Sequence, residues 1–437
     1  MTWLQKLVAV KPGELRALLV SCLYFYLVLC AYYIFRPIRN EITIANGVEN
    51  IQWLFMLGMA ASFAIMPLFG WLTARYKTRQ FMAACTLFFA SNLVIFFFLF
   101  NVDERPDWVS RTFYVWVYVF NMFIVSLFWS FMNDVYSREQ ARRLFAVIAI
   151  GGTLGAMTGP VITAFLVSSL GLGPLLLISA ALLSSSIFCI FWLLRWNNAE
   201  FDQGEADQRE QRAVENKALG GKPLDGLTLI LKSKYLMGIC LFIILFAVSN
   251  SMIVILQAEK IAEEYTDPLA RTRLFSIIDL VVSSLVLFTQ LFLTSKLIRW
   301  IGYRSTLMLI PVIITLGFVS LVFAPVLPLM IALEILRRSG EYAIAKPTRE
   351  MLFSVVPREA KYKAKNFIDT AILRTGDTAS SWIYTGLKTI GAAGATIPAL
   401  CVALGVAWCS VAYWLGSQYA RRSDDAAPAD PESTLKS

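Results

Sequence analysis

The chain alternates between long runs of apolar residues and short polar segments. Two of the longest apolar runs, residues 81–100 and 173–194, contain no charged residue. Each has about the ~20 residues that an α-helix needs to cross ~30 Å of hydrocarbon at 1.5 Å per residue. The pattern therefore predicts an all-α polytopic membrane protein.

The same pattern predicts about twelve spans, six on either side of a polar segment. The first six are residues 14–35, 51–74, 80–101, 111–133, 143–168 and 173–195, and the second six are 234–258, 271–297, 302–323, 325–345, 363–385 and 393–419. The segment at 197–233 is charged and poor in large apolar residues, which favours a cytoplasmic linker. We expect an N-terminal six-helix bundle at 1–196, a C-terminal one at 234–420 and a disordered cytoplasmic tail at 421–437.

Composition agrees with this class, because 57% of the residues are hydrophobic and only 16% are charged. A soluble domain needs roughly a quarter charged residues. The net charge of +9 gathers in alternate loops, as at Arg75, Lys77 and Arg79, whereas residues 101–107 and 258–268 are neutral or acidic. This positive-inside pattern places both termini in the cytoplasm of a bacterial inner membrane protein. It also explains the positive charge better than contact with nucleic acid does.

Two counts argue against chemistry at a metal or catalytic centre. The chain has no histidine, the commonest general base, metal ligand and proton relay. Its seven cysteines all fall within predicted spans without metal-ligand spacing, which is typical of small packing residues. We expect no metal, no cofactor and no enzymatic activity.

The two halves repeat one another. The segment "SREQARRLF" (137–145) follows the fourth predicted span, and "PREAKYKAKNF" (357–367) follows the tenth. Six plus six parallel repeats with both termini inside are typical of the major facilitator architecture, which works by alternating access to a midplane site. A phosphate-binding GxxxxGK[ST] loop, as in ATP-driven exporters, is absent, and so is a filter-like loop of a channel.

Several predicted spans contain ionisable residues. A charge at mid-membrane costs about 2.5–3.5 kcal/mol on insertion scales, and such residues usually face a polar cavity. Glu334, Arg338 and Glu341 recur at i, i+4 and i+7 and form one stripe of a helix. We favour an ion-pair network that stabilises and gates the protein, ahead of direct substrate contact and of a topology signal. Arg374 and Asp377, three residues apart, are also expected to pair.

The first predicted span carries Arg36 and Arg39 on either side of Pro37. If the helix ends at Phe35, these arginines mark the outer interface; if it continues through Thr43, they enter the cavity. We favour continuation, because tilted transporter helices can exceed the length that the bilayer requires.

Arginine suits phosphate or carboxylate groups, because its planar fork donates two hydrogen bonds at once. The substrate-binding candidates are Arg36, Arg39, Tyr118, Asn121, Glu334, Arg338, Lys346, Arg349 and Arg374. The coupling or gating candidates are Asp279, Glu341, Asp369, Asp377, Gly151, Gly155 and Gly159. The three glycines lie four residues apart, so they share a helix face that a neighbouring backbone can approach closely. Packing and gating are compatible interpretations of this ladder.

Three stretches resemble the ATP:ADP antiporter family: "KPTREMLFSVVPREAKYKAKNFID" (346–369), "RPIRNE" (36–41) and "LFWSFMNDVYSREQARRLFAVIAIGGTLG" (127–155). The resemblance covers nearly all twelve spans and implies a major facilitator fold that exchanges ATP for ADP. It aligns Arg39 with a basic residue of the family's "RPLKD" element. It also aligns Asn40 with that element's aspartate, Val117 with an acidic residue, and Asp377 with a lysine.

We therefore predict a secondary transporter, a monomer, that exchanges ATP/ADP-like nucleotides or a related organic anion across the membrane. One alternative is a proton-coupled symporter or flippase for another anionic or amphiphilic substrate, with Asp279, Glu334, Asp369 and Asp377 as proton sites. Another is a membrane scaffold or sensor that transports nothing.

Overall fold

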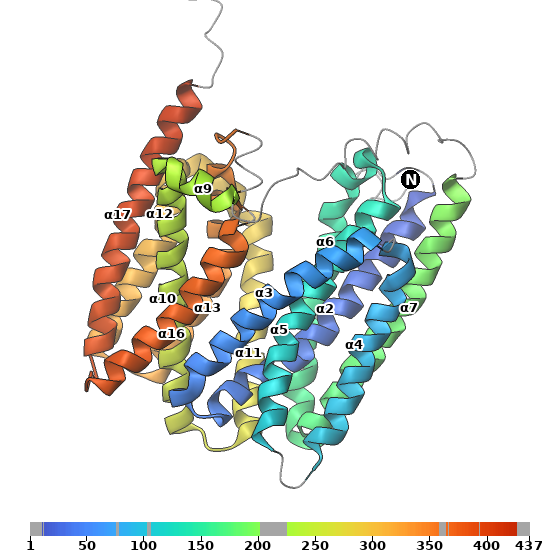
Figure 1. The fold of residues 1–437 in the computed structure, drawn as a ribbon, viewed down its shortest axis with the longest axis horizontal. Coiled ribbons are helices and arrows are strands. Elements are labelled where there is room, and N and C mark those ends of the chain that lie inside the picture. The colour runs from blue at the N-terminus through green and yellow to red at the C-terminus, as the bar shows by residue number, and fades with distance from the viewer. Residues whose placement is uncertain are drawn as a thin grey trace, which may run out of the picture. The chain divides into compact units, whose positions relative to one another are not determined.

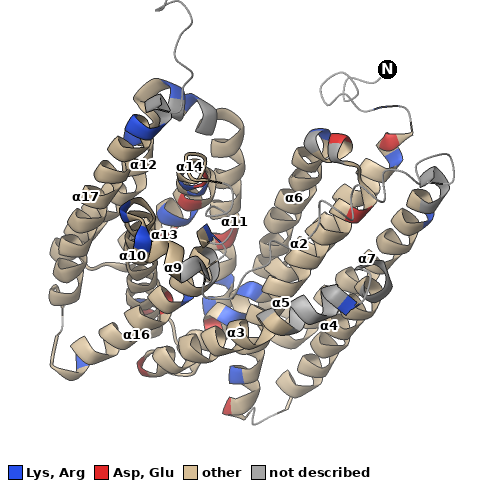
Figure 2. Ribbon diagram, turned by 45° about the horizontal axis from the view of Figure 1, so that its top comes forward, with Lys and Arg blue, Asp and Glu red and all other residues tan. Residues whose placement is uncertain are grey.

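The computed structural model describes residues 11, 13–75, 78–102, 106–201, 225–357, 364–365, 367–392 and 394–425. Every regular element in these ranges is a helix (Figure 1). Ten of the described helices are long and apolar enough to cross a membrane, and Figure 2 shows long stretches of ribbon without an acidic or basic residue. The predicted all-α polytopic class is confirmed. Most of the predicted tail lies outside the described residues.

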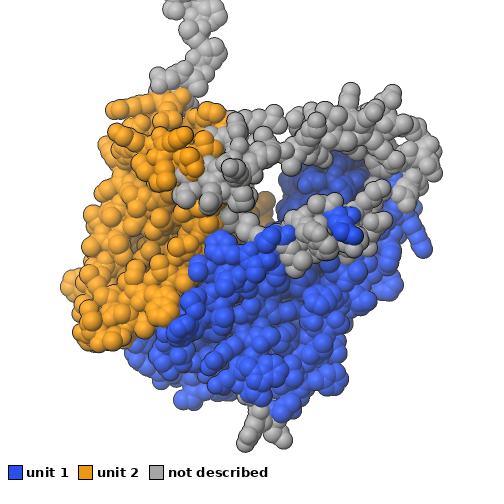
Figure 3. All heavy atoms as spheres, in the orientation of Figure 1, with its two compact units in different colours: residues 1–216, 258–284 blue, residues 217–257, 285–437 orange. Residues whose placement is uncertain are grey.

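The chain divides into two compact units (Figure 3): unit 1 is residues 1–216 and 258–284, and unit 2 is residues 217–257 and 285–437. Unit 1 contains α2 (Glu14–Ala45), η1 (Val48–Asn50), α3 (Ile51–Arg75), α4 (Thr78–Phe100), α5 (Asp107–Val135), α6 (Arg138–Leu170) and α7 (Leu172–Phe201). Unit 2 contains α9 (Asp225–Lys232), α12 (Thr294–Phe323), α13 (Leu327–Gly340), η2 (Glu341–Ala345), α14 (Lys346–Leu352), η3 (Ile368–Ile372), α16 (Leu373–Thr389) and α17 (Thr396–Asp425). Helices α10 (Lys234–Glu264) and α11 (Pro268–Phe292) contribute residues to both units. The predicted limits of the two six-helix bundles remain a prediction.

The observed helices refine the predicted limits. Helix α2 continues past Pro37 to Ala45, which confirms the favoured course of the first span. The eighth span was expected to reach residue 297 but ends at Phe292, and α12 begins at Thr294 and kinks at Gly302, where φ is +76°. The tenth and eleventh spans are helical but contain π-helical turns, η2 and η3. Helix α9 lies within the predicted linker.

In unit 1, α2 packs against α5, α6 and α7. The glycine ladder on α6 makes one of these contacts very close. A Cβ atom added at Gly151, Gly155 or Gly159 would overlap backbone atoms of α2, around Cys22, Tyr26 and Cys30. The packing interpretation of the ladder is therefore confirmed, and the seam lies inside one compact unit. Helix α2 also packs against α5, where the rings of Phe25 and Phe128 stack with centroids 4.1 Å apart.

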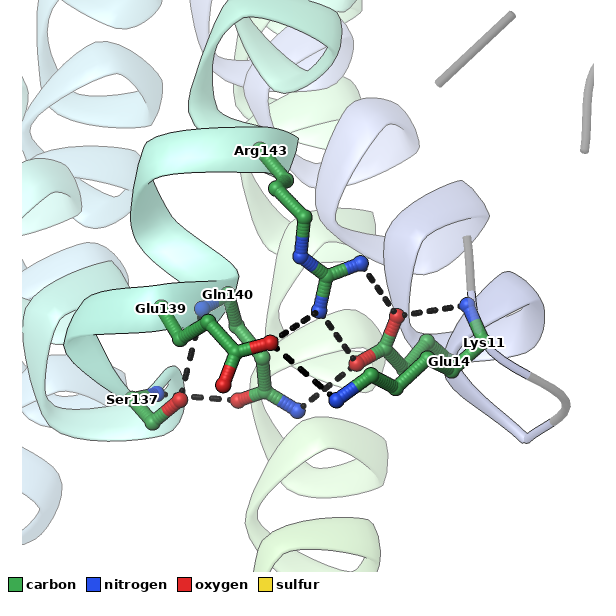
Figure 4. Close-up of polar contacts among 6 residues, drawn as sticks. All are labelled: Lys11, Glu14, Ser137, Glu139, Gln140 and Arg143. Carbon is green, nitrogen blue, oxygen red and sulfur yellow. Dashed lines mark hydrogen bonds and ion pairs between the residues drawn. The ribbon is translucent and has the colours of Figure 1, made fainter. Parts of the chain in front are cut away.

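A polar network ties the first turns of α2 and α6 together (Figure 4). Ser137 and Gln140 form a capping box at the start of α6. Gln140 and Arg143 both donate to the carboxylate of Glu14, with Arg143 Nη2 3.1 Å from Glu14 Oε1. An exposed ion pair between Lys11 and Glu139 lies beside it. The segment "SREQARR" thus starts one helix and fastens it to another.

In unit 2, α12 packs along α17. Small residues allow the approach, because a Cβ atom at Gly405 would overlap Thr315 and one at Gly416 would press on Arg304. The rings of Tyr303 and Tyr419 lie 4.1 Å apart near one end of this pair. The π-helical turn η2 contacts α12, α13 and α14.

Candidate functional site

The charged residues of the spans lie in two groups, one in each compact unit. In unit 1, Arg36 on α2 faces Asp279 on α11, with Nη1 3.7 Å from Oδ1. The Asp279 side chain is fully buried, and the Arg36 guanidinium lies 5.1 Å from the centroid of the Tyr33 ring. Because a buried carboxylate is costly without a partner, this pair holds α11 against α2.

A second ion pair joins the same two helices with the opposite polarity. Here the acidic residue is Glu41 on α2 and the basic residue is Arg271 on α11, with Oε1 4.0 Å from Nη1. Arg271 also donates from Nε to the Tyr265 carbonyl oxygen at 2.8 Å. A hydroxyl bond from Ser283 to the Ala156 carbonyl oxygen, 3.1 Å long, fixes α11 to α6. Neither Glu41 nor Arg271 was among the predicted site residues.

Arg39 lies between these pairs along α2 and has different surroundings. Its Nη2 donates to Asn40 Oδ1 at 2.8 Å, and its guanidinium lies 5.4 Å from the centroid of the Tyr118 ring. The Tyr118 hydroxyl is 3.3 Å from that of Tyr114, one turn away on α5. Arg39 Nε is buried and has no hydrogen-bond partner among the described residues. Asn121, also a candidate, is half-buried further along α5.

Arg39 differs from the other buried and half-buried arginines in its charged partners. Eight described arginines are buried or half-buried: Arg36, Arg39, Arg143, Arg271, Arg337, Arg338, Arg349 and Arg374. Seven of them have a carboxylate oxygen within 4.0 Å. For Arg39 the described residues supply only an amide oxygen and an aromatic face. These groups orient the guanidinium but leave its full charge available to a ligand.

In unit 2, the strongest pair is one that the stripe analysis missed. Arg337 donates from Nε and Nη2 to Glu334 at 2.7–2.9 Å, and both side chains are buried. The predicted partner, Arg338, is also close, with Nε 3.9 Å from Glu334 Oε1. The expected ion pair is confirmed, but Arg337 makes its better hydrogen bonds. The i, i+3 spacing from Glu334 could have identified Arg337 in the sequence.

The next pair spans the π-helical turn η2. Glu341 Oε1 is 3.7 Å from Arg349 Nη1, although the two residues are eight positions apart. In a regular α-helix eight residues rise ~12 Å, so the long side chains and the wider turn must both help to close this distance. Lys346 begins α14 between them and is exposed.

Asp377 on α16 confirms the predicted pair with Arg374, at 4.0 Å between Oδ2 and Nη1. The sequence did not single out its second partner, Ser251 on α10, whose hydroxyl is 3.0 Å from Asp377 Oδ1. The neighbouring Asn250 also hydrogen-bonds this carboxylate. Asp369 belongs to η3, but its side chain lies outside the described part of the structure.

Comparisons with known proteins identify the class to which the chain is similar. The family model described as Major Facilitator Superfamily matches residues 8–344. ADP,ATP carrier protein 1 of Chlamydia trachomatis serovar D is 23% identical over 92% of the chain and 88% of its own length. ADP,ATP carrier protein 2 of Chlamydia pneumoniae is 21% identical over 92% of the chain and 90% of its own length.

Solved transporter structures are similar in fold. A POT family transporter in complex with 5-aminolevulinic acid superposes with a TM-score of 0.62 at 12% identity, covering 93% of this chain and 96% of its own. The nucleoside transporter NupG superposes with a TM-score of 0.58 at 16% identity, covering 94% and 99% of the two chains. At such identities the likeness concerns the fold.

Proposed function

The chain belongs to the Major Facilitator Superfamily, and from that premise we propose that it exchanges organic anions, with nucleotides of the ATP/ADP kind as the substrate class. The ADP,ATP carriers that resemble it over most of their length support this substrate class. The membrane is the bacterial inner membrane, both termini are cytoplasmic, and the transporter acts as a monomer. Positive charge in alternate loops supports that orientation.

The observation that carries the proposal is the lack of a described carboxylate beside Arg39. An uncompensated cation inside a span costs free energy until an anion reaches it. The other buried and half-buried arginines already have acidic partners, so an entering phosphate would have to displace those first. Arg39 needs no such displacement and is the first contact for the substrate anion. The half-buried Tyr118 ring beneath the guanidinium attracts its charge without neutralising it.

Each unit then has its own role. In unit 1, Arg36 and Arg39 form the anion-binding group, and Asp279 restrains Arg36 until substrate arrives. In unit 2, the charged group consists of Glu334, Arg338, Glu341, Lys346 and Arg349, and α16 adds Arg374 and Asp377. Ion pairs that open and re-form during transport provide the gating, and Gly151, Gly155 and Gly159 hold α2 and α6 together as they move.

Counterflow in proteoliposomes tests the proposal. Vesicles loaded with unlabelled ADP should accumulate labelled ATP or ADP, and a pH gradient should leave the rate unchanged. Arg39→Gln should abolish accumulation, whereas Lys346→Gln, at an exposed position, should reduce it only in part. Absence of nucleotide counterflow in well-folded protein would refute the nucleotide assignment.

A second candidate function, proton-coupled transport of another anion or amphiphile, has one observation in its favour. Asp377 is a carboxylate inside a predicted span with a hydroxyl partner, Ser251, that could serve it in either protonation state. Uptake driven by a pH gradient, without nucleotide exchange, would favour this function.

A further inference from the structure

The residue that follows Arg39 is a hydrogen-bond partner of its guanidinium. Asn40 Oδ1 accepts a 2.8 Å hydrogen bond from Arg39 Nη2, and both residues are half-buried on α2. An aspartate has the same shape as asparagine and would accept the same bond. It would also neutralise the arginine, as carboxylates do for every other buried or half-buried arginine described.

We infer that Asn40 is a specificity-determining residue, which orients Arg39 through its amide oxygen while leaving the site one positive charge in excess for an anionic substrate. This inference rests on the proposed function only in taking Arg39 as the anion contact; it does not require that the anion be a nucleotide. Asn40 need not touch the substrate. It positions the Arg39 guanidinium and does not neutralise its charge.

The other neighbours of Arg39 also hold its guanidinium without adding a negative charge. Tyr118 contributes a ring face, which attracts the cation without adding a formal charge. Its hydroxyl lies against that of Tyr114, which fixes the ring beside the guanidinium. The buried Nε–H of Arg39 has no acceptor among the described residues. Together these contacts hold the arginine in place and keep its charge.

Three variants separate charge from orientation. Asn40→Asp keeps the acceptor and adds a negative charge, Asn40→Ala removes the acceptor without changing charge, and Arg39→Gln removes the cation. Purified protein in detergent is heated with and without ATP, ADP or pyrophosphate, and the ligand-induced rise in melting temperature gives an apparent affinity. We expect Asn40→Asp to weaken anion binding by about tenfold or more, because it neutralises the site. Asn40→Ala should weaken binding less.

A double-mutant cycle without ligand tests the same coupling independently. Asn40→Asp should raise the melting temperature of the protein that retains Arg39, because it gives a half-buried cation an anionic partner. The same change in the Arg39→Gln background should lower it, because the new carboxylate then lacks a cation. Equal shifts in the two backgrounds would overturn the inference, as would equal loss of anion binding in Asn40→Asp and Asn40→Ala.

The outcomes distinguish this inference from the proposed function. If pyrophosphate stabilises the protein in an Asn40-dependent manner but nucleotides neither bind nor exchange, the nucleotide assignment fails and the role of Asn40 stands. If nucleotides exchange and Asn40→Asp binds them as well as the unmodified protein does, the role of Asn40 fails and the assignment stands. If none of the three anions binds, both fail.

Discussion

Arg36 and Asp279 meet at 3.7 Å, and further along the same two helices Glu41 and Arg271 meet at 4.0 Å with their charges exchanged between the helices. From Arg36 to Glu41, α2 presents a cation and then an anion. In the same direction in space, α11 presents the anion Asp279 and then the cation Arg271. The pattern matches the antiparallel direction of the two helices, because in a parallel arrangement like charges would face one another. The residues of α11 up to Ser284 belong to unit 1.

Neutralising Asp279 in the pair with Arg36 should destabilise the folded protein. In Asp279→Asn, Arg36 loses its carboxylate inside the fold, and removal of one partner of a buried pair typically destabilises by about 3–5 kcal/mol. We expect a lower melting temperature in detergent and slower counterflow. The exchanged pair, Arg36→Asp with Asp279→Arg, should recover part of both.

The control for this experiment is the singly reversed protein, Asp279→Arg, which places two cations together and should be worse than Asp279→Asn. If the doubly exchanged protein is no better than either single reversal, the ion pair is not what holds α11 on α2.

The glycine ladder makes a sharp steric prediction. Gly155→Ala should destabilise unit 1 strongly, because the added methyl group would overlap the Tyr26 carbonyl oxygen on α2. Gly386→Ala on α16 is the matched control, since an added Cβ there meets nothing within 4 Å and alanine favours a helix. Thermal unfolding in detergent should show a large loss for the first and little change or a small gain for the second. Comparable losses would contradict the close seam between α2 and α6.

Much of this architecture could be predicted from the sequence because its cause is local. Apolar runs of about twenty residues define spans wherever they occur, so α4 matches its predicted range within two residues at each end. Periodicity also placed Glu334 with Arg338 and Arg374 with Asp377, since neighbours on one helix face need no knowledge of the tertiary fold. The stretch 325–345 was expected to be one span, but it contains a π-helical turn that has no strong sequence signature.

The contacts between helices could not be predicted in this way. Glu41 pairs with Arg271 across more than half of the chain, and Ser251 meets Asp377 across 126 positions. A single sequence contains no signal that selects one partner among many serines or arginines. The distinction between Arg39 and the other arginines depends on which carboxylates come near, so it appears only in the folded chain.

The network in Figure 4 includes one ion pair with a buried carboxylate, Arg143–Glu14, and one exposed ion pair, Lys11–Glu139. Arg143→Gln removes the cationic partner of Glu14, whose side chain is only 5% exposed, and should lower the melting temperature by several degrees. Lys11→Gln breaks a neighbouring pair whose members are 63% and 70% exposed, and should have almost no effect. Differential scanning fluorimetry of the two variants checks this. Equal effects would mean that the network does not fasten α2 to α6.

Replacing Asp377 distinguishes an exchange mechanism from proton-coupled transport. In an exchanger its carboxylate serves as a fixed partner of Ser251 and Arg374, so Asp377→Asn should slow counterflow and net uptake in the same proportion, with or without a pH gradient. Ser251→Ala is the matched control, because it removes the hydroxyl and keeps the charge; we expect a smaller loss of the same kind. In a proton-coupled transporter the amide introduced by Asp377→Asn could not bind and release a proton, so gradient-driven uptake would disappear while exchange at equal pH survived. Initial rates in both assays, compared for the unmodified protein and the two variants, decide between these mechanisms, and selective loss of gradient-driven uptake would contradict the exchange proposal.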